Sequence, residues 1–123
     1  MTVWGRSIEK ARTFAQRQGK ALGMHITATD TVEHAVADAD IICTTTGARE
    51  PILEGAWVRA GTHVNLVGAS SARAREANAA LVMKSAYFVD FKSSALAQSG
   101  DLLAATGTLA KAHSRRDRRS IAW

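Results

Sequence analysis

The stretch Gly61 to Glu76, GTHVNLVGASSARARE, constrains the fold more than any other part of the chain. A turn glycine precedes the β-branched and apolar run 62–67, which is typical of a strand. The run ends in Gly68-Ala69-Ser70-Ser71, and the small and charged residues after it predict a helix that reaches about Ser85. Ligands of doubly wound α/β sheets bind at the carboxyl ends of strands, so this crest is the first candidate site.

Strand-like and helix-like segments alternate along the rest of the chain. Further strands are predicted over 2–4, 25–28, 41–44 and 87–90, and helices over 8–19, 30–37 and 93–99. Ser7 and Asp30 are the expected N-caps, and Gly19 is the expected end of the first helix. The alternation predicts an α/β fold, a three-layer parallel sheet with helices on both faces.

Composition limits the class of protein. Hydrophobic residues make up 46% and charged residues 22% of 123 residues, which is typical of one folded domain. Cys43 is the only cysteine, which excludes an intrachain disulfide and a cysteine-based zinc cluster; we expect it in the core of the third strand, which looks buried on both faces. No signal peptide and no membrane-spanning run of roughly 20 apolar residues is visible, so a cytoplasmic location is expected.

The net charge of +5 is concentrated at the C-terminus. Residues 114–119 hold four arginines and one aspartate. Neither a basic helical face nor interleaved aromatic residues accompany them, so we expect a solvated tail rather than a nucleic-acid site. The expected domains are 1–108, the α/β part, and 109–123, the basic tail. The four histidines lie far apart, and no metal site is expected.

The residues after the first strand bear on the choice of cofactor. In a dinucleotide-binding fold, an acid at the end of the second strand binds the ribose of NAD, and an arginine suits the 2′-phosphate of NADP. This chain has Arg6 and Ser7 there. The alternative is that Ser7 only caps a helix and that Arg6 is solvated.

Two strand ends could line a cofactor groove. Thr44, Thr45 and Thr46 follow the third strand, and Val67, Gly68 and Ala69 end the fourth. A glycine lets a ligand approach the backbone closely. The alternative is that the threonines only reflect β propensity and that the crest is an ordinary turn. The G-x-G-x-x-G turn that opens a Rossmann unit occurs nowhere in the chain.

Several short segments together carry a resemblance. They are Val3-Trp4-Gly5-Arg6-Ser7 with Lys10-Ala11; Ala39-Asp40-Ile41-Ile42 with Thr44, Thr46 and Glu50-Pro51; Gly61-Thr62-His63-Val64-Asn65 with Val67-Gly68-Ala69-Ser70 and Arg75-Glu76; and Val89-Asp90 with Ser99-Gly100-Asp101-Leu102. In order and spacing, over roughly 3–103, the chain resembles the ornithine cyclodeaminase and mu-crystallin family, which also includes archaeal-type alanine dehydrogenases and cyclic-imine reductases.

The resemblance implies the nucleotide-binding part of a two-domain enzyme that is a homodimer at full length. The chain would be an incomplete Rossmann domain without its first strand and glycine-rich loop, and inactive alone. Two sheet edges would then be exposed, and either Thr2 to Trp4 moves beside the strand at 41–44 or another chain fills the gap. We therefore expect marginal stability and a tendency to associate.

Ser70 bears on the reaction. The resemblance implies an aspartate at this position in cyclodeaminases and alanine dehydrogenases, and commonly a serine in mu-crystallin and related reductases. A serine without help is no general base at neutral pH. This favours NADPH-dependent reduction of a cyclic ketimine, such as a pyrroline- or piperideine-2-carboxylate. The alternatives are an ornithine cyclodeaminase or alanine-dehydrogenase-like enzyme that uses NAD, and a protein that binds NADP or a small molecule without catalysis.

Overall fold

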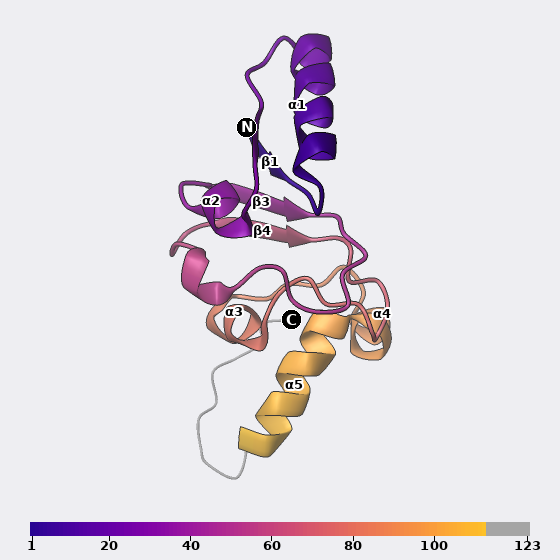
Figure 1. Ribbon diagram of the computed structural model, residues 1–123. Coiled ribbons are helices and arrows are strands. Elements are labelled where there is room, and N and C mark those ends of the chain that lie inside the picture. Colours follow the sequence, from indigo (N-terminus) through magenta and orange to yellow (C-terminus); the bar gives the residue numbers. More distant parts are fainter. Residues whose placement is uncertain (113–123) are drawn as a thin grey trace. The chain divides into compact units, whose positions relative to one another are not determined.

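The computed structural model describes residues 1–112, with side chains to Gly107 (Figure 1). The chain divides into two compact units, Met1–Asp40 and a second unit that begins at Ile41. Each unit is described here by itself. No helix among residues 1–112 combines the length and the apolar character that crossing a membrane requires.

The first unit is a strand–helix–strand–helix unit. It contains β1 (Thr2–Trp4), α1 (Ile8–Leu22), β2 (Thr27–Thr29) and α2 (Val32–Val36). The strands β1 and β2 pair in parallel, with Thr2 opposite Thr27 and Trp4 opposite Thr29. The indole Nε1 of Trp4 donates to the carbonyl oxygen of Asp30 at 3.1 Å and ties the end of β1 to the residue after β2.

Two of the predicted helix boundaries in this unit are wrong. Ser7 caps α1 as predicted, because its Oγ accepts from the Lys10 N–H at 3.3 Å. The helix does not stop at Gly19, however; it ends at Gly23, whose φ of 64° is the left-handed conformation of a helix end. The cap of α2 is Thr31 rather than Asp30, because the Thr31 backbone is extended and its hydroxyl accepts from the His34 N–H in the first turn at 3.3 Å.

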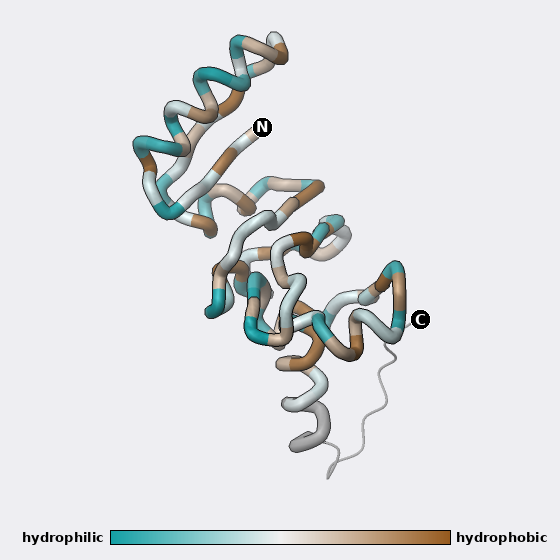
Figure 2. Tube along the Cα trace, turned by 90° about the vertical axis from the view of Figure 1, so that its right-hand side faces the viewer, coloured by the Kyte–Doolittle hydropathy of each residue, from teal (hydrophilic) through white to brown (hydrophobic). Residues whose placement is uncertain are grey.

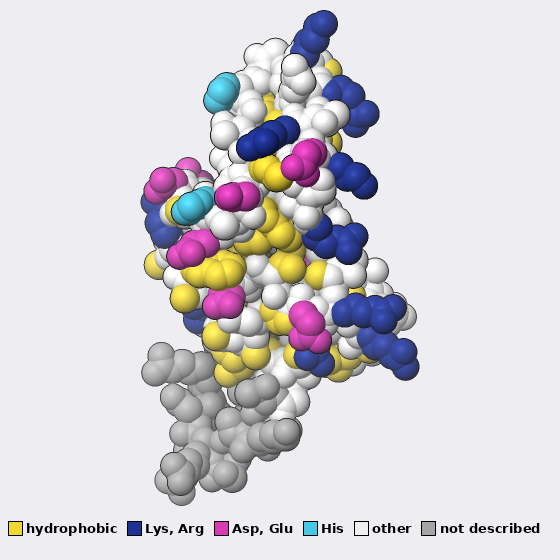
Figure 3. Space-filling model, in the orientation of Figure 1, with side chains coloured by type: hydrophobic (Ala, Val, Ile, Leu, Met, Phe, Trp, Pro, Cys, Tyr) yellow, Lys and Arg dark blue, Asp and Glu magenta, His cyan; other side chains and the backbone are white. Residues whose placement is uncertain are grey.

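The first unit buries little apolar surface of its own. Its buried apolar residues are Ala11, Ala15 and Val36, whereas Phe14 is 43% exposed. Figure 2 shows hydrophilic and hydrophobic residues alternating around α1, and Figure 3 shows lysine and arginine side chains along that helix. Units of roughly 40 residues rarely hold together on so small a core.

The second unit contains another parallel pair of strands and most of the helices. Its elements are β3 (Ile41–Thr44), the 3₁₀ helix η1 (Gly55–Trp57), β4 (His63–Leu66), α3 (Ala79–Lys84), α4 (Lys92–Gln98) and α5 (Gly100–Ala112). β3 and β4 pair from Ile41 opposite His63 to Thr44 opposite Leu66. The predicted α/β class with parallel strands is confirmed.

The strand pairs match part of a doubly wound sheet. In the order 3-2-1-4-5-6, strands 2 and 3 lie on one side of strand 1, and strands 4 and 5 on the other. Here β1 pairs with β2 in the first unit, and β3 pairs with β4 in the second. Both expected ways of filling the gap beside β3 stay predictions. Marginal stability and association stay predictions.

The chain after β4 differs most from the prediction. No helix follows the crest: α3 begins only at Ala79, where the Asn78 Oδ1 accepts from the Leu81 N–H at 2.9 Å. Residues 87–90 form no strand, because they have no pairing partner among the described residues. The last helix runs beyond 108 to Ala112, and the predicted tail from 113 on lies outside the described residues, so the boundary at 108 stays a prediction.

β3 is covered on one face only. Ile42 and Thr44 are buried, whereas Ile41 is 67% exposed and Cys43 is exposed. The prediction that this strand is buried on both faces, with Cys43 in the core, is wrong. The alternation follows from the pleat, which points successive side chains to opposite faces.

The core of the second unit lies among its helices and loops. Its most buried apolar side chains are Leu53, Ala77, Leu81, Leu102 and Ala105. The parallel bridge between Leu53 and Ala77 ties the segment before η1 to the segment before α3. This bridge lies next to Glu76, whose carbonyl oxygen accepts from the Leu53 N–H at 2.8 Å.

Gly100 should tolerate no side chain. A Cβ on Gly100 would lie 2.8 Å from the carbonyl oxygen of Ser71 and closer still to that of Ala74. We expect Gly100→Ala to lower the free energy of unfolding by about 1–3 kcal/mol or more, because the loop before α3 must move. Urea unfolding followed by circular dichroism measures this.

The matched control is Gly107→Ala in the same helix. A Cβ there meets no atom within 4 Å, so the control should be neutral or slightly stabilising. Equal stability of the two variants would contradict the close packing at Gly100.

Candidate functional site

A buried carboxylate joins the carboxyl ends of β3 and β4. Glu76 is 0% exposed. Its Oε2 accepts from the Thr44 hydroxyl at 2.6 Å and from the Gly68 N–H at 2.7 Å. Its Oε1 accepts from the Thr46 N–H at 2.5 Å. One side chain thus bonds to the residues that leave both strands at the edge where α/β sheets bind ligands.

A second buried carboxylate supports the first. Asp101 is 1% exposed, and its Oδ1 accepts from the backbone N–H groups of Glu76 and Ala77 at 2.8 and 2.9 Å. Its Oδ2 has no hydrogen-bond partner among the described residues. Burial raises the pKa of Asp101; the two N–H groups oppose this shift, and the nearby Glu76 carboxylate adds to it.

Gly68 is required by the packing of the two strand ends. A Cβ on Gly68 would lie 2.6 Å from the carboxyl carbon of Glu76 and closer to the carbonyl oxygen of Thr46. The sequence suggested that a ligand approaches this glycine. In the structure, the atoms closest to this glycine belong to Thr46 and Glu76. Their packing alone requires a residue without a side chain here.

The structure brings most of the predicted cofactor residues together at one edge and divides them into two groups. Thr44, Thr46 and Gly68 bond to Glu76. The residues Thr45, Val67 and Ser70 are exposed, Val67 by 61%, and Ala69 is buried. Neither the Thr45 nor the Ser70 hydroxyl makes a hydrogen bond to the described part of the chain. The three exposed residues are therefore open to a ligand, whereas Ala69 is not.

The other predicted residues lie in the first unit. Arg6 is exposed two residues after the end of β1, and its side chain makes no hydrogen bond or ion pair within residues 1–107. Ser7 is engaged at the start of α1, where its hydroxyl also donates to the Glu9 carboxylate at 3.1 Å. The cap predicted as the alternative role of Ser7 is therefore present.

The sequence analysis did not assign a role to Glu76 or to Asp101. Both lie in segments that carry the family resemblance, and that was the only signal. Glu76 is 32 residues from Thr44, its partner, and Asp101 is 25 residues from Glu76. Nothing in the local pattern around either acid distinguishes it from a solvated one.

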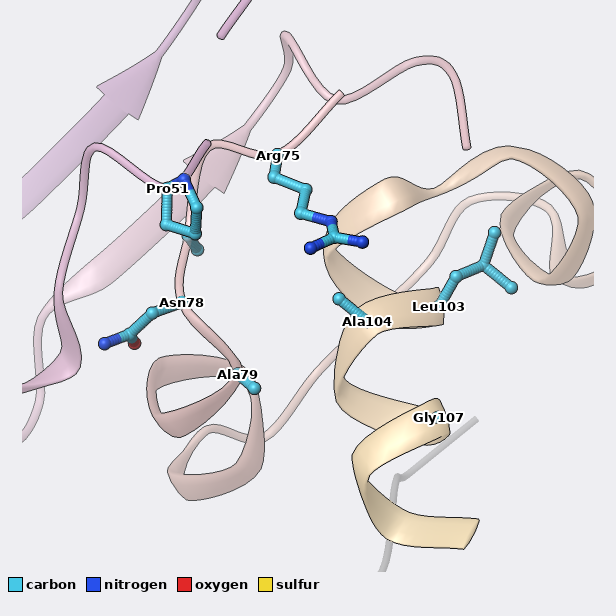
Figure 4. Close-up of a pocket in the computed structure, with 8 residues that line it drawn as sticks. Pro51, Arg75, Asn78, Ala79, Leu103, Ala104 and Gly107 are labelled. Carbon is cyan, nitrogen blue, oxygen red and sulfur yellow. The ribbon is translucent and has the colours of Figure 1, made fainter. Parts of the chain in front are cut away.

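A hollow of about 420 Å³ lies elsewhere in the second unit (Figure 4). Its lining consists of Pro51, Arg75, Ala77, Asn78, Ala79, Leu103, Ala104 and Gly107. The Arg75 guanidinium extends toward α5, and the Asn78 side chain points away from that helix (Figure 4). None of the predicted cofactor residues lines this hollow, so it is not part of the candidate site. No group of three or more His, Cys, Asp or Glu in the described part could hold a metal ion.

The raised pKa of Asp101 predicts a pH dependence of stability. The folded protein holds this proton more tightly than the unfolded chain, so the contribution is full below the unfolded pKa, near 3.8, and is lost as the pH rises through the folded pKa. Asp101→Asn keeps an oxygen for the two N–H groups and does not titrate. We expect the stability of this variant to fall less than that of the wild type from about pH 4 to about pH 7.

Urea unfolding at a series of pH values measures the difference, with Asp38→Asn as the control. Asp38 is exposed, so this variant should follow the wild type. Parallel curves for Asp101→Asn and the wild type would contradict the prediction.

Comparison with known proteins identifies the family. The model of the ornithine cyclodeaminase/mu-crystallin family matches residues 1–116. The chain is 38% identical over 103 residues to the Delta(1)-pyrroline-2-carboxylate reductase of Paracoccus denitrificans, covering 84% of this chain and 32% of that protein. It is 41% identical over 102 residues to the ketimine reductase mu-crystallin of Mus musculus, covering 82% and 31%.

Solved structures share the fold. The Thermococcus litoralis Delta(1)-pyrroline-2-carboxylate reductase in complex with NADH and L-proline has a TM-score of 0.83 and 36% identity, over 87% of this chain and 33% of that chain. An archaeal alanine dehydrogenase dimer with bound NAD has a TM-score of 0.78 and 23% identity, over 88% and 33%. The chain spans about a third of the length of these proteins. It belongs to the ornithine cyclodeaminase/mu-crystallin family, and its fold is Rossmann-like.

Proposed function

We propose that the chain is part of the dinucleotide-binding domain of a reductase that uses NADPH to reduce cyclic ketimines of the pyrroline- or piperideine-2-carboxylate type. The observation that carries this proposal is the edge at which Glu76 brings 44–46 and 67–69 together. The similarity to proteins named as pyrroline-2-carboxylate and ketimine reductases supports the substrate class. The activity belongs to the whole protein, and this chain alone is proposed to be inactive.

The exposed residues of the edge fit a dinucleotide. Val67 offers an apolar surface, and the hydroxyls of Thr45 and Ser70 make no hydrogen bond to the described residues. A nicotinamide ring is flat and largely apolar with one amide, so an edge that offers an exposed apolar side chain and two hydroxyls suits it. The nicotinamide supplies the hydride, and the protein binds and orients it.

Ser70 supports reduction over deamination. Its hydroxyl carries no charge and can donate or accept one hydrogen bond, whereas a carboxylate in its place could take a proton from a substrate amine. The proposal therefore assigns Ser70 a binding role toward the substrate or the nicotinamide amide. Ornithine cyclodeaminase and alanine dehydrogenase chemistry is the alternative that this residue disfavours.

Arg6 supports the choice of NADP over NAD. It lies two residues after the end of β1 and is exposed. A guanidinium binds phosphate oxygens through two hydrogen bonds in one plane. The adenine ribose of NAD has no 2′-phosphate and therefore cannot make this contact. NAD is the alternative, and NADH is present in the Thermococcus litoralis structure. A homodimer and a cytoplasmic location stay predictions for the full-length protein.

The cofactor preference is tested by calorimetric titration of the chain with NADPH and with NADH. We expect weak binding, with NADPH bound more tightly. Arg6→Ala should weaken NADPH binding about tenfold or more and leave NADH binding unchanged, because only the 2′-phosphate loses a charge-assisted contact.

Arg12→Ala on α1 is the matched control, since it removes a similar exposed charge away from the end of β1. Tighter binding of NADH than of NADPH by the unchanged chain would overturn the assignment of Arg6. Tight binding without reduction of any cyclic ketimine, in a protein of the family's full length, would favour a non-catalytic binding protein.

A further inference from the structure

We propose that Glu76 is a positioning residue of the dinucleotide site. Its carboxylate holds the ends of β3 and β4 at the spacing that the exposed residues Thr45, Val67 and Ser70 need to contact the cofactor. This inference rests on the proposed function. Glu76 itself is 0% exposed, so it acts through its neighbours rather than by touching the cofactor.

Backbone hydrogen bonds between β3 and β4 stop at the carboxyl ends of the two strands. The last such bond joins the Val67 N–H to the Thr44 carbonyl oxygen at 3.0 Å. Within the described part of the chain, the next links run through the Glu76 carboxylate, which accepts from the Thr46 N–H on one oxygen and from the Gly68 N–H on the other. The spacing of the two crests therefore depends on one side chain.

The backbone of Glu76 is also fixed, because both its N–H group and its carbonyl oxygen are hydrogen-bonded. Its backbone N–H donates to the Asp101 Oδ1 at 2.8 Å, and its carbonyl oxygen accepts from the N–H groups of Ile52 and Leu53 at 3.0 and 2.8 Å. With the backbone fixed and the carboxylate bonded to three donors, the side chain has little freedom to follow a moving loop. The carboxylate therefore fixes the positions of the segments 44–46 and 67–69 rather than following their movement.

The exposed residues are direct neighbours of the bonded ones. Thr45 lies between Thr44 and Thr46, which both donate to Glu76. Val67 precedes Gly68, the third donor. Because a shift of about 1 Å in a positioning group is enough to weaken a site markedly, the carboxylate is expected to control how well these residues meet a ligand.

Glu76→Gln tests the inference with almost no change in shape. The amide has one acceptor oxygen, so its NH₂ group must face a donor, either the Thr46 N–H or the pair formed by the Thr44 hydroxyl and the Gly68 N–H. We expect amide hydrogen exchange, measured by NMR, to become about tenfold faster or more at Thr46 or at Gly68. The amides of Ile42 and Asn65, which lie inside the strand pair, should change less than about twofold.

The same samples are titrated with NADPH and followed by the amide shifts of Thr45, Val67 and Ser70. NADPH affinity is expected to fall about tenfold in Glu76→Gln. The control Glu54→Gln, on an exposed side chain, should match the wild type in exchange and in affinity. A merely structural role would raise exchange equally at the ladder amides Ile42 and Asn65 and at the loop amides Thr46 and Gly68.

A milder pair of variants serves if Glu76→Gln does not fold. Thr44→Val removes one donor from the carboxylate, and Thr44→Ser retains it. Thr44→Val should speed exchange at Gly68, whose N–H shares the same oxygen of Glu76, and should weaken NADPH binding. Thr44→Ser should restore both toward the wild type.

The outcomes separate this inference from the proposed function. Unchanged exchange at both Thr46 and Gly68 in Glu76→Gln overturns the inference, whatever binds. Faster exchange with unchanged NADPH affinity also overturns it, because the carboxylate then fixes the loops without serving the site. If the wild type shows no shifts with NADPH or NADH, the proposed function fails, and the positioning role toward a dinucleotide fails with it, while the exchange data still decide whether Glu76 holds the loops.

Discussion

The second unit depends on a carboxylate that is removed from water and satisfied by three donors. A buried charge costs several kcal/mol unless it is paired or hydrogen-bonded. Glu76 meets this requirement with one hydroxyl and two backbone N–H groups, all from the ends of the parallel strands β3 and β4. These N–H groups lie beyond the last backbone hydrogen bond between the two strands. Without Glu76 they would need water or another acceptor. The acid and the strand ends thus satisfy each other.

The first unit, residues 1–40, has no buried carboxylate of this kind. Its two strands pair over three positions, and its buried apolar side chains are two alanines and one valine. The contact between the Trp4 indole and the Asp30 carbonyl, together with the caps at Ser7 and Thr31, fixes local geometry but buries little surface. Most of the buried apolar side chains of the described residues belong to the second unit, so it carries most of the apolar burial that favours folding.

The sequence predicted those features that depend on local pattern. β3, β4 and the cap at Ser7 follow from β-branched runs and from a hydroxyl before a helical stretch, and the family follows from the order of short segments. The end of α1 was wrong because Gly19 and Gly23 both suit a helix end, and only the left-handed backbone at Gly23 decides between them. The helix expected after the crest ends near 85 as predicted, but it begins only at Ala79. The two N–H groups at 76 and 77 bond to Asp101 instead, a contact that a local pattern does not reveal.

The candidate site shows the same limit. Its position at the carboxyl ends of β3 and β4 could be predicted, because strand order and crest glycine are visible in the sequence. The division of its residues into those bonded to Glu76 and those open to a ligand could not, because it depends on contacts across 32, 30 and 8 residues. Gly68 illustrates this. The sequence offered a ligand or a turn as reasons for the glycine, and the structure adds a third, the close approach of Thr46 and Glu76.

The neighbouring Asp101 explains how two acids share one buried region. Its Oδ1 accepts from two backbone N–H groups, but its Oδ2 has no partner among the described residues, and burial raises its pKa. A protonated Oδ2 carries no charge and therefore needs less compensation than a carboxylate oxygen. The cluster thus holds two buried acids with different surroundings. Both carboxylate oxygens of Glu76 accept hydrogen bonds, whereas one oxygen of Asp101 accepts two and the other has no partner among the described residues.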